Sequence, residues 1–139
     1  MLLSLWRADT THSAAMTPKV EALLGPALID LGAVADPDCW ITWGDDPSRW
    51  SMLVPTPAGL ATIHVRVMVP QEGPRVAGKL VRWNRVQIGD YSIESHSGHR
   101  ILSFQIEGQV LHAADEECER MAAFIAVLLA ALDGRPTPK

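Results

Sequence analysis

Apolar residues at helical spacing predict one helix near the N-terminus of the chain. Thr17 followed by Pro18 is typical of a helix start, with Thr17 as the N-cap and proline in the first turn. Gly25-Pro26 interrupts the pattern, which predicts a kinked helix or two short helices. Residues 1–16 fit either an irregular lead-in or a short helix. The apolar positions of the helical segment are Val20, Leu23, Leu24, Ala27, Leu28 and Leu31.

A second apolar stripe predicts an amphipathic helix near the C-terminus. Asp115 is placed to act as its N-cap, and the acidic residues that follow complement the positive end of the helix dipole. Gly134 suits the C-cap, so residues 134–139 are expected to form a tail. The stripe consists of Cys118, Met121, Ala122, Ile125, Leu128, Leu129 and Leu132.

Between these helices, alternating apolar and polar residues predict antiparallel strands. The clearest alternation covers residues 60–69, and CWITWG and RWSMLVP predict two strands before it. A loop is expected over residues 70–78, and further strands from residue 79 to about residue 111. The predicted fold class is α+β. We expect an antiparallel meander of about five or six strands, with the N-terminal helical segment and the C-terminal helix packed on one face.

The segment ESHSGHR, residues 94–100, predicts a β-hairpin whose two-residue turn is Ser97-Gly98. In this register His96 lies opposite His99, and the two strands separate into an apolar and a polar face. A shift by one residue would mix the two faces, which supports the register. The apolar face receives Tyr91, Ile93, Leu102 and Phe104, and the polar face receives Ser92, Glu94, His96, His99 and Ser103.

Gly89-Asp90 predicts a second two-residue turn, which would add a third strand before the hairpin. That strand would place Trp83 opposite His96 and Arg85 opposite Glu94. The polar face would then gain an ion pair, and an aromatic ring beside a histidine.

An apolar group on an otherwise polar sheet face is typical of contact with another chain, often a second copy. Trp83 forms such a group with Val81 and Ile101, unless a long loop or residues 1–16 cover it. The surface predicted to bind a second copy or a protein partner consists of Trp83, Arg85, Glu94, His96, His99, Ile101, Val81, Arg66 and His64.

Single-stranded nucleic acid is an alternative ligand, because arginines and aromatic residues on a sheet can contact phosphates and stack bases. KLVRWNR, residues 79–85, together with His64 and Arg66 would supply these groups. The net charge of −4 argues against it. Six basic and three acidic residues fall between Leu60 and Phe104, against six and thirteen elsewhere. This division favours ion pairing within or between subunits over an anion site.

A metal-dependent enzyme with a site at the His96/His99 hairpin is another alternative. Imidazoles on opposed strand residues could share a metal, with Glu94 as a third ligand. However, catalytic zinc needs three well-supported ligands, and Glu94 is expected to pair with Arg85. The sequence contains no nucleophile elbow, phosphate-binding glycine loop, paired-cysteine motif or His-Glu metal helix. We therefore predict no catalytic residues, no metal and no cofactor.

The composition is that of a globular protein, since 47% of the 139 residues are hydrophobic and 20% are charged. The length predicts a single domain over residues 1–139. Cys39 and Cys118 are expected to be reduced and packed. The start, MLLSLWRAD, has too short an apolar run for a signal peptide, and no run reaches the roughly 18 residues of a membrane span. A cytoplasmic location without membrane binding is therefore expected.

The order of predicted elements from Thr17 to Leu132 resembles that of the type III secretion chaperone-like fold and of YbjN-like bacterial proteins. The nearest local similarity is WITWGDDPSRWSMLV, an aromatic strand, an acidic turn and a second aromatic strand. The resemblance concerns topology, and no functional residue is carried over. It implies a non-enzymatic protein, often a homodimer, that binds another polypeptide.

Overall fold

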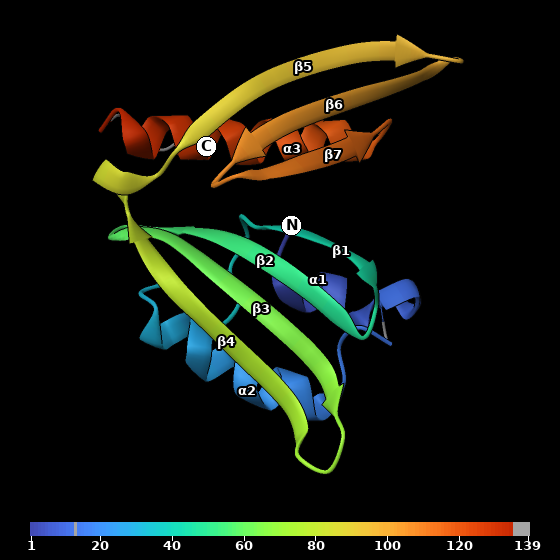
Figure 1. The fold of residues 1–139 in the computed structure, drawn as a ribbon, viewed down its shortest axis with the longest axis vertical. Coiled ribbons are helices and arrows are strands. Elements are labelled where there is room, and N and C mark those ends of the chain that lie inside the picture. The colour runs from blue at the N-terminus through green and yellow to red at the C-terminus, as the bar shows by residue number, and fades with distance from the viewer. Residues whose placement is uncertain (13, 135–139) are drawn as a thin grey trace. The chain divides into compact units, whose positions relative to one another are not determined.

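The computed structural model describes residues 1–12 and 14–134, whose helices and strands are shown in Figure 1. They group into two compact units, which divide between Val81 and Arg82. Each unit contains an antiparallel sheet. The expectation of a single domain stays a prediction.

Three helical segments open the first unit: α1 (Leu3–Ala8), the 3₁₀ helix η1 (Thr10–His12) and α2 (Pro18–Asp30). The N-cap prediction is confirmed, because the Thr17 hydroxyl accepts a hydrogen bond from the Val20 N–H at 3.2 Å. Helix α2 continues through Pro26, so, of the two predicted alternatives, a kinked helix and two short helices, the second is wrong. Burial of the stripe formed by Val20, Leu24 and Leu28 holds the helix together across the proline.

The first unit has a four-stranded sheet in the order β1-β2-β3-β4. Strand β3 confirms the predicted alternation from Ile63 to Arg66, where Ile63 and Val65 are buried and the residues between and after them are exposed. Residues 59–63 do not alternate, because all of them are buried. Strand β4 begins at Gly73, immediately after a turn closed by a hydrogen bond from the Glu72 N–H to the Val69 carbonyl, so most of the expected loop is strand. The strands are β1 (Ile41–Asp46), β2 (Arg49–Thr56), β3 (Gly59–Val69) and β4 (Gly73–Arg82).

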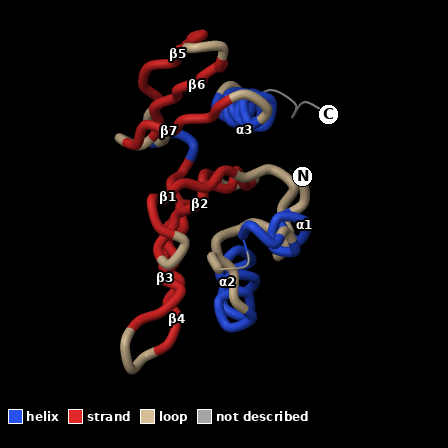
Figure 2. Tube along the Cα trace, turned by 90° about the vertical axis from the view of Figure 1, so that its right-hand side faces the viewer, coloured by secondary structure: helices blue, strands red, loops and turns tan. Residues whose placement is uncertain are grey.

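Helices α1 and α2 cover one face of this sheet, as Figure 2 shows. The N-terminal segment contributes to the core on this face, because Trp6 packs against Trp40 and Trp50 with ring centroids 5.4 and 5.5 Å away. Its other core residues are Leu3, Ala15 and Met16. The indole N–H of Trp50 donates to the Ala15 carbonyl at 2.8 Å. The N–H group of this buried tryptophan therefore has its hydrogen-bond acceptor in the N-terminal segment, for which the sequence predicted either an irregular lead-in or a short helix.

The second unit contains η2 (Trp83–Arg85), β5 (Ile88–His96), β6 (His99–Ile106), β7 (Gln109–Ala114) and α3 (Glu117–Leu132). Its three strands form a separate antiparallel sheet in the order β5-β6-β7. Helix α3 packs on β6 and β7. The buried residues of the unit, apart from those of α3, are Leu102, Phe104, Ile106, Leu111 and Ala113.

The register predicted for the ESHSGHR hairpin is confirmed: β5 and β6 pair His96 with His99 and Ile93 with Leu102. Ser97 and Gly98 have φ angles of 51° and 82°, the backbone of a type I′ turn. Directly opposed residues share a face, so Ile93 and His96 lie on opposite faces of the sheet.

The predicted turn at Gly89-Asp90 is wrong. Strand β5 continues through both residues, and its register with β6 shifts between Ile88 and Tyr91. This is the signature of a β-bulge, in which glycine is common. A Cβ at Gly89 would overlap the Gln105 side chain, so the bulge requires glycine.

The third strand expected before the hairpin is also absent, because residues 83–85 form the 3₁₀ helix η2. The predicted pairs of Trp83 with His96 and of Arg85 with Glu94 are therefore wrong. Strand β6 instead has β7 on its other side, joined by a second turn with positive φ at Glu107 and Gly108.

The α+β class is confirmed, but the single meander of five or six strands is replaced by two sheets, of four and three strands. Neither Cys39 nor Cys118, both within the described residues, forms a disulfide, and Cys118 is buried. None of the helices in the described ranges has the length and apolar character needed to span a membrane.

Candidate functional site

The nine residues of the predicted binding surface are divided between the two units. His64, Arg66 and Val81 belong to the first unit, and the other six belong to the second. Paired strands bring four of those six together, with His96 opposite His99 and Glu94 opposite Ile101 on one face.

This histidine face, made of Ser92, Glu94, His96, His99, Ile101, Ser103 and His112, is held at one end by Asp115. One carboxylate oxygen of Asp115 lies 2.9 Å from His99 Nδ1, and the other accepts the Arg100 N–H at 3.1 Å. These bonds lower the pKa of the Asp115 carboxyl, the one from His99 most and the one from the Arg100 backbone next. Asp115 is therefore used to fix β6. The N-cap of α3 is Glu116, which makes no side-chain capping bond, so the prediction of Asp115 as the cap is wrong.

Each sheet also carries one hydrogen-bonded serine–histidine pair across neighbouring strands. Ser103 Oγ lies 2.8 Å from His112 Nδ1, and Ser51 Oγ lies 2.8 Å from His64 Nδ1. A nucleophilic dyad needs its base oriented by a third group. Among the described side chains, no carboxylate is hydrogen-bonded to His64 or His112, and no cluster of metal-ligating residues occurs. These pairs are typical of cross-strand contacts.

The opposite face of β5 is apolar and uncovered. Ile88, Tyr91 and Ile93, here called the β5 surface, are 38%, 55% and 50% exposed. The residues opposite them on β6 are buried, because α3 packs on β6 and β7. Figures 1 and 2 both show β5 as the sheet edge that extends beyond α3. The bulge contributes to this surface, since it brings Ile88 onto the same face as Tyr91.

Strand β5 is an edge strand with limited protection, which consists of its bulge and the carboxylates of Asp90 and Glu94. It has only one neighbouring strand, all nine of its residues are exposed, and it contains neither lysine nor proline. Natural proteins commonly use such residues to prevent an edge from pairing with another chain. Sequence reasoning missed this surface because the alternation in β5 is the same whether or not a helix covers it.

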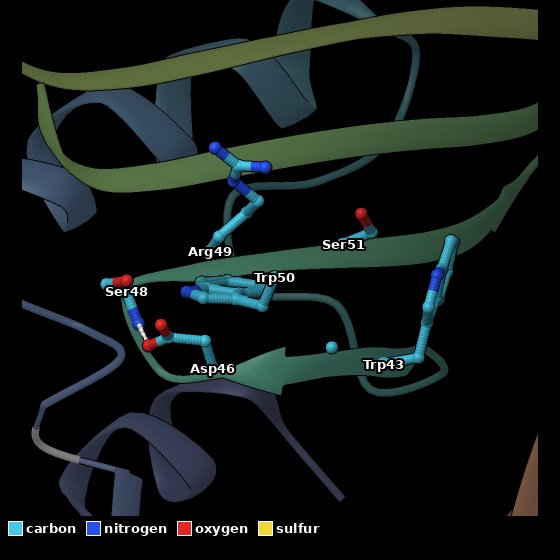
Figure 3. Close-up of a pocket in the computed structure, with 7 residues that line it drawn as sticks. Trp43, Asp46, Ser48, Arg49, Trp50 and Ser51 are labelled. Carbon is cyan, nitrogen blue, oxygen red and sulfur yellow. Dashed lines mark hydrogen bonds between the residues drawn. The ribbon is translucent and has the colours of Figure 1, made fainter.

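A second candidate site is a hollow of about 390 Å³ beside the β1–β2 turn, shown in Figure 3. Arg49 and Trp43 project on the same side of β2, with Ser51 between them. Asp46 accepts the Ser48 N–H at 2.8 Å, and this backbone bond is the main reason that the pKa of Asp46 is lowered. The residues around the hollow are Trp43, Gly44, Asp46, Ser48, Arg49, Trp50 and Ser51.

No family model matches this sequence, and neither the curated proteins nor the solved structures contain a significant match.

Proposed function

We propose that the protein is a non-enzymatic protein-binding domain that associates with a second copy of itself through strand β5. The observation that carries this proposal is the exposure of Ile88, Tyr91 and Ile93 on an edge strand. An exposed apolar edge binds another polypeptide by adding a strand to the sheet, with main-chain hydrogen bonds supplying affinity.

Charge favours one register for this association. Two copies of β5 can pair antiparallel around a two-fold axis, as in most homodimers. An axis at Ser92 would place Asp90 opposite Glu94, which is unfavourable for like charges. An axis at Ile93 separates these carboxylates and places Asp90 opposite His96 of the other copy. We therefore favour pairing centred on Ile93, which joins the two β5 surfaces on one face.

The β5 surface is on the opposite side of the sheet from the histidine face, which contains four of the nine residues predicted to bind a partner. Both remain candidate interfaces, and one pair of substitutions separates them. Ile93→Lys places a charge on the β5 surface, whereas Ile101→Lys places the same charge on the histidine face. Chaperone-like binding of a further polypeptide and a cytoplasmic location stay part of the proposal.

Solution mass by light scattering tests the proposal. We expect the wild type to have about twice the mass of the 15.2 kDa chain, Ile93→Lys to be monomeric, and Ile101→Lys to remain dimeric. Circular dichroism of both variants checks that they fold. A monomeric wild type would overturn the proposal, and loss of the dimer only in Ile101→Lys would assign the interface to the histidine face.

A further inference from the structure

Positive charge in the first unit is concentrated on its sheet. Residues 1–81 contain six Lys or Arg and eight Asp or Glu. Five of the eight acidic residues precede β1, and the other three lie near the β1–β2 and β3–β4 turns. Four of the six basic residues lie on three adjacent strands: Arg49 on β2, Arg66 on β3, and Arg75 and Lys79 on β4.

The pairing of β2 with β3 places two of these residues on one face. Arg49 lies directly opposite Arg66, and the neighbouring pair on that face is Ser51 and His64. Trp43 on β1 lies opposite Ser51 and therefore shares the same face. This face points away from the core formed with α1 and α2, which takes the alternate residues of the strands.

The β4 residues are assigned to the same face by their neighbours. Val76 packs against the core, and a Cβ on Gly78 would lie 3.2 Å from Leu31 Cδ1 and 3.3 Å from Ile63 Cγ1. Val76 and Gly78 therefore face the helices, and Arg75 and Lys79 face the other way. We call the surface of Arg49, His64, Arg66, Arg75 and Lys79 the basic face.

Among the described side chains, Arg75 alone of the basic face forms an ion pair. Arg75 pairs with Glu72 at 3.0 Å, but no described carboxylate forms an ion pair with Arg49, Arg66 or Lys79. Arg49 makes a minor contribution to the lowered pKa of Asp46, after the hydrogen bonds from Ser48. Like charges directly opposed across strands are destabilising, so an anion between Arg49 and Arg66 would relieve their repulsion.

We propose that the basic face binds single-stranded nucleic acid, with phosphates on Arg49, Arg66 and Lys79 and a base stacked on Trp43. Antiparallel sheets that bind single strands combine cations that follow the backbone with an aromatic side chain for the bases. The hollow between Trp43 and Arg49 provides both groups at one place (Figure 3). A duplex keeps its bases stacked on one another, so no base would be free to stack on Trp43. This activity is independent of the association through β5.

Fluorescence anisotropy of a labelled, mixed-sequence DNA strand of about 16 nucleotides tests this proposal. Between about 50 and 200 mM salt, three phosphate contacts predict a slope of log affinity against log salt of roughly −2. The double variant Arg49→Gln/Arg66→Gln should bring the slope to about −0.7 and weaken binding at low salt. Trp43→Leu should weaken binding about tenfold with little change in slope.

Lys19→Gln/Arg100→Gln is the matched control, because it removes the same charge from exposed residues outside both the basic face and residues 79–85. It should bind like the wild type. Absence of any anisotropy change at the lowest salt would overturn the proposal. So would equal weakening by the control variant, or equally tight binding of the same sequence as a duplex.

Discussion

Ile93 and Leu102 lie directly opposite each other on one face of the β5–β6 pair, yet Leu102 is 2% exposed and Ile93 is 50% exposed. The two residues have the same apolar character and the same orientation. They differ in their surroundings, because Leu102 is on the central strand β6, on which α3 packs, and Ile93 is on the edge strand β5. This boundary within a continuous apolar face defines the surface that we propose for association.

Alanine substitutions at these two positions should have very different effects on the isolated chain. Leu102→Ala removes buried methyl groups and should lower the free energy of unfolding by about 2–5 kcal/mol. Ile93→Ala loses mainly β-propensity and should cost about 1 kcal/mol or less. Urea unfolding at the lowest measurable protein concentration compares the two. Equal losses would mean that Ile93 is covered within the chain.

Gly89→Ala should destabilise the second unit, because the added Cβ overlaps the Gln105 side chain in the bulge. Forced overpacking of this kind costs about 1–3 kcal/mol. Gln105→Ala in the same chain should restore part of the loss, which a double-mutant cycle in urea would measure as coupling. Additive effects would show that the two positions are not in contact.

The β5–β6 turn offers a stabilising substitution. Ser97 has a φ of 51°, a conformation that asparagine adopts more readily in a type I′ turn. Ser97→Asn should therefore raise the midpoint of thermal unfolding, by the equivalent of about 0.5 kcal/mol. Ser97→Val is the control, since a β-branched residue is strained at positive φ, and its midpoint should fall. A rise for both variants would contradict this reading of the turn.

Asp115 should make stability depend on pH in the acid range. Its pKa is lower in the folded chain than the ordinary value of 3.8, first through His99 and then through the Arg100 N–H. The stabilisation is complete above that ordinary value and is lost as the pH falls through the lower, folded value. Asp115→Asn should be less stable than the wild type at neutral pH, and the difference should disappear on acidification. Denaturant unfolding across this range measures it, and a difference that is independent of pH would refute the prediction.

Several local features could be predicted from the sequence because nearby residues decide them. Thr17-Pro18 starts α2 as expected, since capping depends on residues three positions apart. Ser97-Gly98 determines the β5–β6 register, because a two-residue turn and a period of two leave one pairing that separates apolar from polar side chains. The α+β class followed from these patterns.

The errors occurred where a choice depends on residues distant in the chain. Gly89-Asp90 suits a tight turn as well as a bulge, and the contact with Gln105 on β6 is part of the bulge. Strand β4 pairs with β3, and among the described strands none joins β4 to β5, so one expected sheet becomes two. The predicted pair of Glu94 and Arg85 is wrong because residues 83–85 form the 3₁₀ helix η2 and not a strand beside β5.

By itself, therefore, the sequence determined the local elements and the division of each strand into an apolar and a polar side. The tertiary structure decided which apolar sides are covered and which basic residues meet. The alternation of Tyr91 and Ile93 is the same beneath a helix or in solvent, and Arg49 and Arg66 become neighbours only when β2 pairs with β3. Burial and charge repulsion both depend on spatial neighbours, which a one-dimensional pattern does not contain.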